Sequence, residues 1–232
     1  MEPSVVTPTG GWTDPDQVAW YTERIGRIEA RLAGEAMLRE ALPAAPRRVL
    51  DLGCGDGRLG AVVLDAAPSV ERLVAGDRSE PMLRLARERF AGDDRVEVVE
   101  LDLGDPLALD GSFDVVVSGF AIHHLEHERK RALFAEIGRA LAPGGVFANL
   151  EVVRSSTPAR HAQFLAAVGR TADDPEDRLA PVEDQLAWMG AAGLTEVECL
   201  WRWRGFALLV GEAPPEVPGA GAAAGPPSRT LS

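Results

Sequence analysis

Two neighbouring histidines, His123 and His124, are the side chains in this sequence best suited to acid–base chemistry. They follow a strand-like apolar run that begins at Phe113, and a charged, helix-like segment comes after them. Open α/β sheets bind ligands at the carboxyl ends of their strands, so we expect the pair at a ligand-binding edge. Imidazole titrates near neutrality and can take a proton from a hydroxyl group. In the alternative, structural interpretation, one ring caps the next helix or packs beneath a ligand.

Three glycines at alternate positions, Gly53, Gly55 and Gly57, close an apolar strand. Such a loop lets the backbone approach a nucleotide-like ligand, although it can also form only a tight corner. A dinucleotide fingerprint would need its third glycine at Arg58, and a phosphate loop would need Lys followed by Ser or Thr. The remaining pattern, Asp-x-Gly-x-Gly-x-Gly from Asp51, resembles the first motif of class I S-adenosylmethionine (SAM) dependent methyltransferases.

Further segments follow in the order typical of that family. The short apolar run 72–77 ends in Asp77, at the offset of a ribose-binding carboxylate, which can accept two hydroxyl hydrogen bonds. The strand-like run 96–103 and a Pro-Gly turn at 143–145 come later. The resemblance implies SAM as the cofactor, with the ribose at Asp77 and the adenine amine at Asp102. The cofactor contacts that we expect in this part of the chain are Asp51, Gly53, Cys54, Gly55, Asp77, Arg78, Met82, Asp102, Leu103, Gly119 and Phe120.

Strand-like runs alternate with helix-like segments, as a parallel sheet with covering helices requires. With the resemblance, this predicts an α/β fold. We expect a Rossmann-like, doubly wound sheet of seven mainly parallel strands, with an antiparallel C-terminal strand and helices on both faces. Residues 1–46 are expected to form an N-terminal helical lid or cap, and 47–211 the SAM-binding domain. Residues 212–232 are rich in Pro, Gly and Ala and predict a disordered tail.

The N-terminal segment carries apolar side chains at helical spacing from Val18 to Leu32, which predicts a helix that docks on the domain. A basic stripe beside it begins at Arg24 and reaches Arg31. The stripe either faces a carboxylate of the cofactor or substrate, or is solvated. In the resembled family the N-terminal helix often covers the cofactor. On that analogy, Tyr21 and Arg24 are candidate cofactor contacts.

Composition narrows the partners. The 232 residues carry a net charge of −12, which disfavours a long contact with nucleic acid. Cys54 and Cys199 show neither metal-ligand spacing nor a disulfide framework, so we expect no metal and a reducing, cytoplasmic location. No apolar stretch reaches the ~18 residues that span a bilayer, so no membrane partner is expected. A small-molecule substrate is favoured, and a homodimer is the protein assembly considered.

The catalytic residues follow from a narrower resemblance. Some sugar O-methyltransferases have a His-His pair after the fourth strand and an acid at the end of the fifth, which here is Glu151. That carboxylate would orient the imidazole of His123 or His124 and stabilise its protonated form. The helix after the histidines is expected to bury Leu133 and its apolar neighbours and to leave charged residues, Lys130 among them, in water.

Three functions remain open at this stage. The first is methyl transfer from SAM to a hydroxyl, carboxylate or amine of a small bacterial metabolite, with a hydroxyl favoured. The second is a non-methylating use of SAM, as in carboxy-SAM synthase, which has a similar fold. There, Arg202 and Arg204 would pair with an added carboxylate. The third is a non-catalytic SAM-binding protein, in which the histidines and Glu151 would not matter.

Overall fold

The computed structural model describes residues 11–12, 14–25, 28–107 and 112–216. Its helices are α1 (Pro15–Ile25), α2 (Glu29–Ala41), α3 (Arg58–Ala66), α4 (Glu80–Arg89), α5 (His127–Ala140), α6 (Pro158–Ala167) and α7 (Val182–Ala191), with a short 3₁₀ turn, η1 (Ile122–His124). Its strands are β1 (Arg48–Leu52), β2 (Arg72–Asp77), β3 (Val96–Glu100), β4 (Phe113–Gly119), β5 (Leu141–Val152), β6 (Thr195–Trp203) and β7 (Phe206–Glu212).

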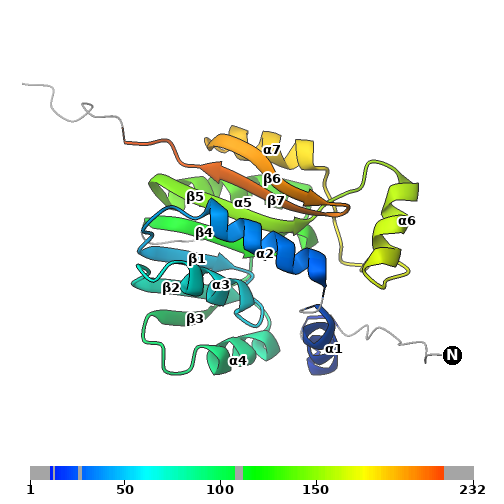
Figure 1. Cartoon of the computed structure of the whole chain (residues 1–232), viewed down its shortest axis with the longest axis horizontal. Helices are drawn as coiled ribbons and strands as arrows, with labels where there is room; N and C mark the ends of the chain where they lie inside the picture. The colour runs from blue at the N-terminus through cyan, green and yellow to red at the C-terminus, as the bar shows by residue number, and fades with distance from the viewer. Residues whose placement is uncertain (1–10, 13, 26–27, 108–111, 217–232) are drawn as a thin grey trace, which may run out of the picture.

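The strands form one seven-stranded sheet in the order β3-β2-β1-β4-β5-β7-β6 (Figure 1). Strands β1 to β5 pair in parallel, whereas β7 is antiparallel to both β5 and β6. This confirms the predicted α/β fold and its antiparallel C-terminal strand. The chain order reverses at β1 and β4, so their carboxyl ends form the crevice where a doubly wound sheet binds its ligand.

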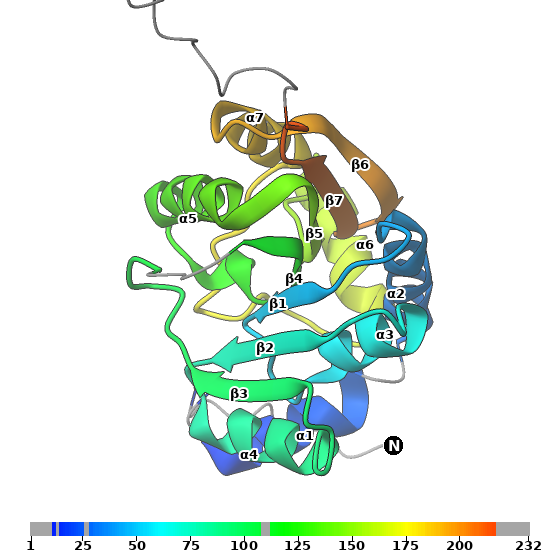
Figure 2. The ribbon, with the colours of Figure 1, turned by 90° about the vertical axis from the view of Figure 1, so that its left-hand side faces the viewer.

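The two faces of the sheet have separate cores because successive strand residues point to opposite sides. In β1, Val49 packs on one face and Leu50 on the other, and in β4 Val115 and Val116 divide in the same way. Figure 2 shows α2 and α3 on one side of the sheet and α5 and α7 on the other. Among the described residues, no helix combines the length and apolar character needed to cross a bilayer.

The N-terminal segment differs from its prediction. Helix α1 ends at Ile25 and α2 begins at Glu29, and α2 packs against β5, β6 and β7 as part of the helix layer. Gly34 permits this close approach, because a Cβ there would lie 2.6 Å from a methyl carbon of Leu150. Leu32, expected in the docking stripe, is instead 46% exposed. The segment expected to form one lid is therefore divided into α1, which contacts α4, and α2, which belongs to the helix layer.

The C-terminal strands pair as expected but extend further. Strand β6 continues to Trp203, so the link to β7 is shorter than the predicted 202–205. Ala213 is buried and its backbone N–H donates to the carbonyl of Gly145 at 2.8 Å. The ordered domain therefore passes the boundary predicted at residue 211. Residues 217–232 of the predicted tail lie outside the described residues.

Candidate functional site

The glycine loop after β1 requires glycine for two physical reasons. Gly53, Gly55 and Gly57 have φ of 66°, 55° and 77°, in the left-handed region that side chains disfavour. Space is also missing at two of them. A Cβ on Gly53 would lie 2.3 Å from the Cβ of Ala121, and one on Gly57 would lie 2.4 Å from the ring of Phe90. The loop thus brings bare backbone to the crevice between β1 and β4.

Asp77, at the end of β2, holds this loop in place. One carboxylate oxygen accepts a hydrogen bond from the backbone N–H of Gly55 at 2.8 Å, and the other accepts from that of Ser79 at 2.8 Å. Burial raises the pKa of the Asp77 carboxyl, although both hydrogen bonds oppose the shift. Each oxygen keeps acceptor capacity, so the carboxylate can still bind ligand hydroxyl groups.

Asp51 lies beneath the loop rather than in the pocket. It is fully buried, and one oxygen accepts from the N–H of Gly60 at 2.8 Å, which fixes the start of α3. Its other oxygen has no hydrogen-bond partner among the described residues. Burial, with a contribution from the Asp77 charge, raises the pKa of Asp51 to about 7. Asp51 thus supports the loop and does not line the pocket, and its contact with the cofactor stays a prediction.

A pocket of about 390 Å³ opens at this edge of the sheet. That volume is within the range of small-ligand sites. Ten predicted cofactor residues line it: Gly53, Cys54, Gly55, Asp77, Arg78, Met82, Asp102, Leu103, Gly119 and Phe120. The side chains of Tyr21 and Arg24 lie outside the described residues. The prediction missed Trp12, Glu176 and Arg178, which also line the pocket.

Arg31, on α2, and Phe120, directly after β4, lie side by side in the lining of the pocket. The Arg31 guanidinium lies 4.8 Å from the centroid of the Phe120 ring, and its Nε donates to Glu35 at 2.9 Å. Phe120 has φ of 54°, a left-handed conformation that costs a non-glycine residue roughly 1 kcal/mol or more. A hydrogen bond from its N–H to the carbonyl of Leu150, at 2.8 Å, helps to hold it. Of the predicted basic stripe, Arg31 faces the pocket.

The two histidines have different surroundings. Nδ1 of His123 lies 2.6 Å from Glu151, whose side chain is fully buried. Burial alone would lower the pKa of His123, but the Glu151 carboxylate and then Asp177 outweigh it and raise the pKa. His123 and Glu151 are therefore a buried imidazole–carboxylate pair, as the sequence predicts. Neither side chain lines the pocket.

His124 is the histidine that lines the pocket. Its ring centroid is 4.0 Å from that of His123 and 5.6 Å from that of Trp12. Burial, with the positive charge of His123 and Arg78, lowers the pKa of His124 to about 2. At neutral pH its imidazole is therefore uncharged.

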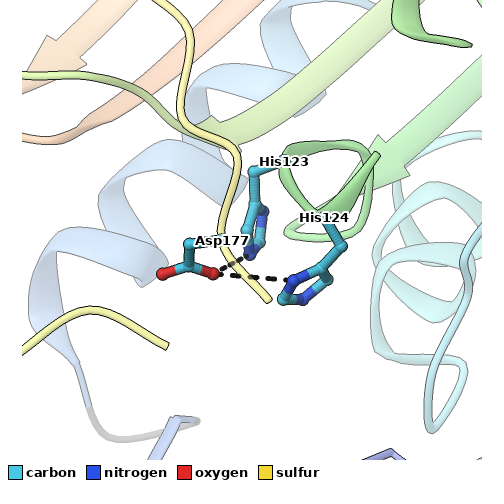
Figure 3. A group of neighbouring side chains, drawn as sticks. All are labelled: His123, His124 and Asp177. Carbon is cyan, nitrogen blue, oxygen red and sulfur yellow. Dashed lines mark ion pairs between the residues drawn. The ribbon is translucent and has the colours of Figure 1, made fainter. Parts of the chain in front are cut away.

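Asp177 completes this group and was not predicted as a site residue. Its Oδ1 lies 3.4 Å from Nε2 of His123 and 3.5 Å from Nδ1 of His124 (Figure 3). It belongs to the segment between α6 and α7, where the sequence shows several acidic residues without a periodic pattern. That cluster was the available signal, but nothing in it distinguishes Asp177 from its neighbours.

Lys130 corrects the expectation that it faces water. Its side chain is buried, and Nζ donates to the carbonyls of Leu125 at 2.8 Å and His123 at 3.3 Å, and to that of Arg178. Burial lowers the pKa of Lys130 to about 8. The ammonium thus joins η1 to the segment that carries Asp177, and it holds the histidine pair and Asp177 together.

The donors and acceptors of the pocket fit SAM. Asp77 and Asp102 supply carboxylate acceptors of the kind that ribose hydroxyls and an adenine amine require, and Met82 and Leu103 supply apolar walls. Asp102 uses one oxygen to accept from the N–H of Gly104 at 2.8 Å, which leaves the other available. By contrast, Arg202 and Arg204, the basis of the carboxy-SAM hypothesis, are exposed on the β6–β7 hairpin and do not line the pocket.

Comparison with known proteins agrees with this geometry. Residues 49–145 match the family model of a methyltransferase domain. Demethylmenaquinone methyltransferase of Clavibacter sepedonicus is 40% identical over 123 residues, which cover 53% of this chain and 47% of that protein. Trans-aconitate 2-methyltransferase of Acidovorax sp. is 35% identical over 126 residues, 54% of this chain and 46% of that protein. The chain thus spans about half the length of these relatives.

Solved structures agree in fold. The mitomycin 7-O-methyltransferase superposes with a TM-score of 0.67 at 20% identity, over 86% of this chain and 58% of that one. A structure of PigF with S-adenosylhomocysteine (SAH) gives a TM-score of 0.66 at 23% identity, over 87% of this chain and 60% of the other. At these identities the likeness concerns the arrangement of strands and helices.

Proposed function

We propose that this protein, which belongs to the class I SAM-dependent methyltransferases, transfers a methyl group from SAM to a hydroxyl group of a small molecule. The observation that carries the choice of acceptor is the position of His124 in the wall of the pocket, with its ring 4.0 Å from that of His123 and the His123–Glu151 pair behind it. An amine acceptor can react through positioning alone, whereas a hydroxyl must lose its proton.

The cofactor is held by the glycine loop after β1 and by residues at the ends of β2 and β3. Asp77 binds the ribose hydroxyls, Asp102 the adenine amine, and the backbone of Gly53 and Gly55 lies against the methionine part. Arg31 lines the same pocket, so its guanidinium can meet a carboxylate of the cofactor or of the substrate. Comparable pockets occur at the switch point of doubly wound sheets, where backbone groups and a carboxylate together select a nucleoside.

When bound, SAM would supply a methyl group carried on a positively charged sulfur. Its transfer would form a bond from the methyl carbon to the acceptor oxygen, break the bond from that carbon to sulfur and leave SAH. The protein's own part is to orient the acceptor, exclude water and activate the hydroxyl. We assign activation to His124, with His123 and Glu151 behind it. Acid–base assistance of this kind contributes roughly 10²–10⁴-fold to rate.

The test is a panel of small acceptors of three classes, which carry a hydroxyl group, an amine or a carboxylic acid. The readout is the formation of SAH. Hydroxyl acceptors should be methylated by the wild-type protein, and His124→Ala should lose turnover while SAH still binds. Methylation of amines alone, unaffected by His124→Ala, would refute the hydroxyl assignment. SAH binding without turnover of any acceptor class would favour a non-catalytic SAM-binding protein.

A further inference from the structure

One buried carboxylate oxygen near the pocket has no hydrogen-bond partner among the described residues. It is Oδ1 of Asp177, whose side chain is 3% exposed. The other oxygen of Asp177 accepts from the N–H of Asp174 at 3.1 Å, so the side chain is fixed in place. A buried anionic oxygen is costly unless a donor or cation faces it. What faces Oδ1 is the two histidine rings, at distances longer than a good hydrogen bond.

The nitrogens that face this oxygen are available as ligands. The Nδ1 atom of His123 is engaged by Glu151, which leaves Nε2 toward Asp177. Nδ1 of His124 is buried and has no hydrogen-bond partner within the described part of the chain. Figure 3 shows both rings turned toward the one carboxylate oxygen. A cation held between them would be ligated by Oδ1 of Asp177 and by the lone pairs of both nitrogens in their unprotonated form.

The distances fit a metal ion. One nitrogen of each histidine and an oxygen of Asp177 all lie within 4.8 Å of one another. In a tetrahedral site with bonds of about 2.0–2.1 Å, neighbouring ligand atoms are about 3.3–3.4 Å apart. The observed 3.4 Å and 3.5 Å from Oδ1 match two of those edges. Two imidazoles and a carboxylate are a ligand set for first-row transition metals.

The surroundings also resemble those of a metal site. Metal-bound histidines usually donate their other ring N–H to a carboxylate, and Glu151 is in that position at 2.6 Å from His123. Lys130 is directed to backbone carbonyls and leaves the carboxylates of Glu151 and Asp177 uncompensated by hydrogen bonds from it. The carboxylates of Glu151 and Asp177, on either side of the His123 ring, favour a cation at this place.

We propose that His123, His124 and Asp177 bind one divalent first-row transition-metal ion at the wall of the cofactor pocket, with an open position for the acceptor's oxygen. The metal site stands on the geometry alone, and its role toward the acceptor rests on the proposed function. In that role the ion held by the histidines would make the acceptor's hydroxyl group more acidic, and the hydroxyl proton would be released to water.

The experiment uses Zn²⁺ as the probe and full-length protein dialysed against a chelator and then against metal-free buffer. Calorimetric titration should show one Zn²⁺ bound per chain. Glu151→Gln should weaken binding by roughly 10- to 100-fold, as loss of an outer-shell partner does, and Asp177→Asn by more. The matched control is Asp173→Asn. Asp173 pairs with His161 at 2.8 Å, and neither residue belongs to the cluster of His123, His124 and Asp177. The Asp173→Asn protein should therefore bind Zn²⁺ like the wild type.

Two readouts keep the interpretation clear. SAH titration of the same samples reports the cofactor pocket. If the wild type binds SAH but does not bind one Zn²⁺ per chain, the metal site is refuted and the proposed function is not. If the wild type does not bind SAH, the proposed function is refuted. The visible absorption spectrum of Co²⁺ bound to the wild type needs no variant. It should show the bands of a low-symmetry Co²⁺ ion with nitrogen and oxygen ligands. Equal Zn²⁺ affinity in the wild type and Asp177→Asn would also refute the proposal, because the ion would then bind elsewhere.

Discussion

Replacing Asp77 by Ala tests the cofactor assignment most directly. In the proposed complex, this carboxylate accepts two ribose hydroxyl groups. A hydrogen bond to a charged group contributes about 1.5–3 kcal/mol, so two of them at the lower value amount to about 3 kcal/mol. That corresponds to a roughly 100-fold weaker Kd for SAH. Isothermal titration calorimetry with SAH measures this directly.

Asp77 also supports the loop, so the measurement needs a structural check. Ala would remove the acceptors for the N–H groups of Gly55 and Ser79, each bound at 2.8 Å. Asp77→Asn retains the shape and one acceptor but removes the charge, and we expect an intermediate loss of about tenfold. Asp65→Ala, which changes an exposed ion pair with Arg39, is the control and should bind SAH normally.

The outcome that would refute the reasoning is specific. If Asp77→Ala binds SAH within about fivefold of the wild type while its melting temperature is unchanged, the ribose lies elsewhere. If the melting temperature falls steeply but Asp77→Asn binds like the wild type, the carboxylate serves the loop and not the ligand.

Three further predictions concern buried charges. Glu35→Ala should lower the free energy of unfolding by about 3 kcal/mol in urea titration, because Glu35 accepts from Arg58 at 2.6 and 2.7 Å, and exposed Glu40→Ala should not. Lys130→Met should cost roughly 1–3 kcal/mol and speed tryptic cleavage between α6 and α7, since buried carbonyls lose their donor; equal cleavage would contradict this. For Asp51, the raised folded pKa of about 7 means that its stabilising contribution is present below its unfolded pKa, near 4, and is lost as pH rises through 7. Asp51→Asn should therefore gain melting temperature over the wild type at about pH 8 but not at about pH 4, and an identical pH profile would show the carboxyl is not perturbed.

The parts of the site that the sequence predicted are those set by local chain geometry. The loop from Gly53 to Gly57 and the acid at Asp77 end short apolar strands, so their place at the edge follows from the strand pattern. The sequence also predicted that one of the two histidines meets Glu151, because parallel β4 and β5 are neighbours and these residues follow or end those strands; it did not say which histidine.

The unpredicted parts depend on contacts between distant segments. Lys130 occupies a charged position on an amphipathic helix, and it is buried where its Nζ donates to three carbonyls, one of them from the distant Arg178. Leu32 fits the apolar stripe of one continuous helix but is exposed, because α2 instead buries the face with Gly34 and Leu38. Periodicity cannot tell which of two overlapping faces meets the sheet.

The division of roles between the two histidines follows from the same tertiary contacts. In sequence they are adjacent and chemically equal. In the 3₁₀ turn η1 their rings lie 4.0 Å apart, but His123 reaches Glu151 inside the protein while His124 lies at the pocket wall. The segment with Asp177 then closes over both rings, and Lys130 fixes that segment to the turn. Substitutions at His123 should thus act through the position and charge of the group, whereas those at His124 should also change the surface that meets the ligand.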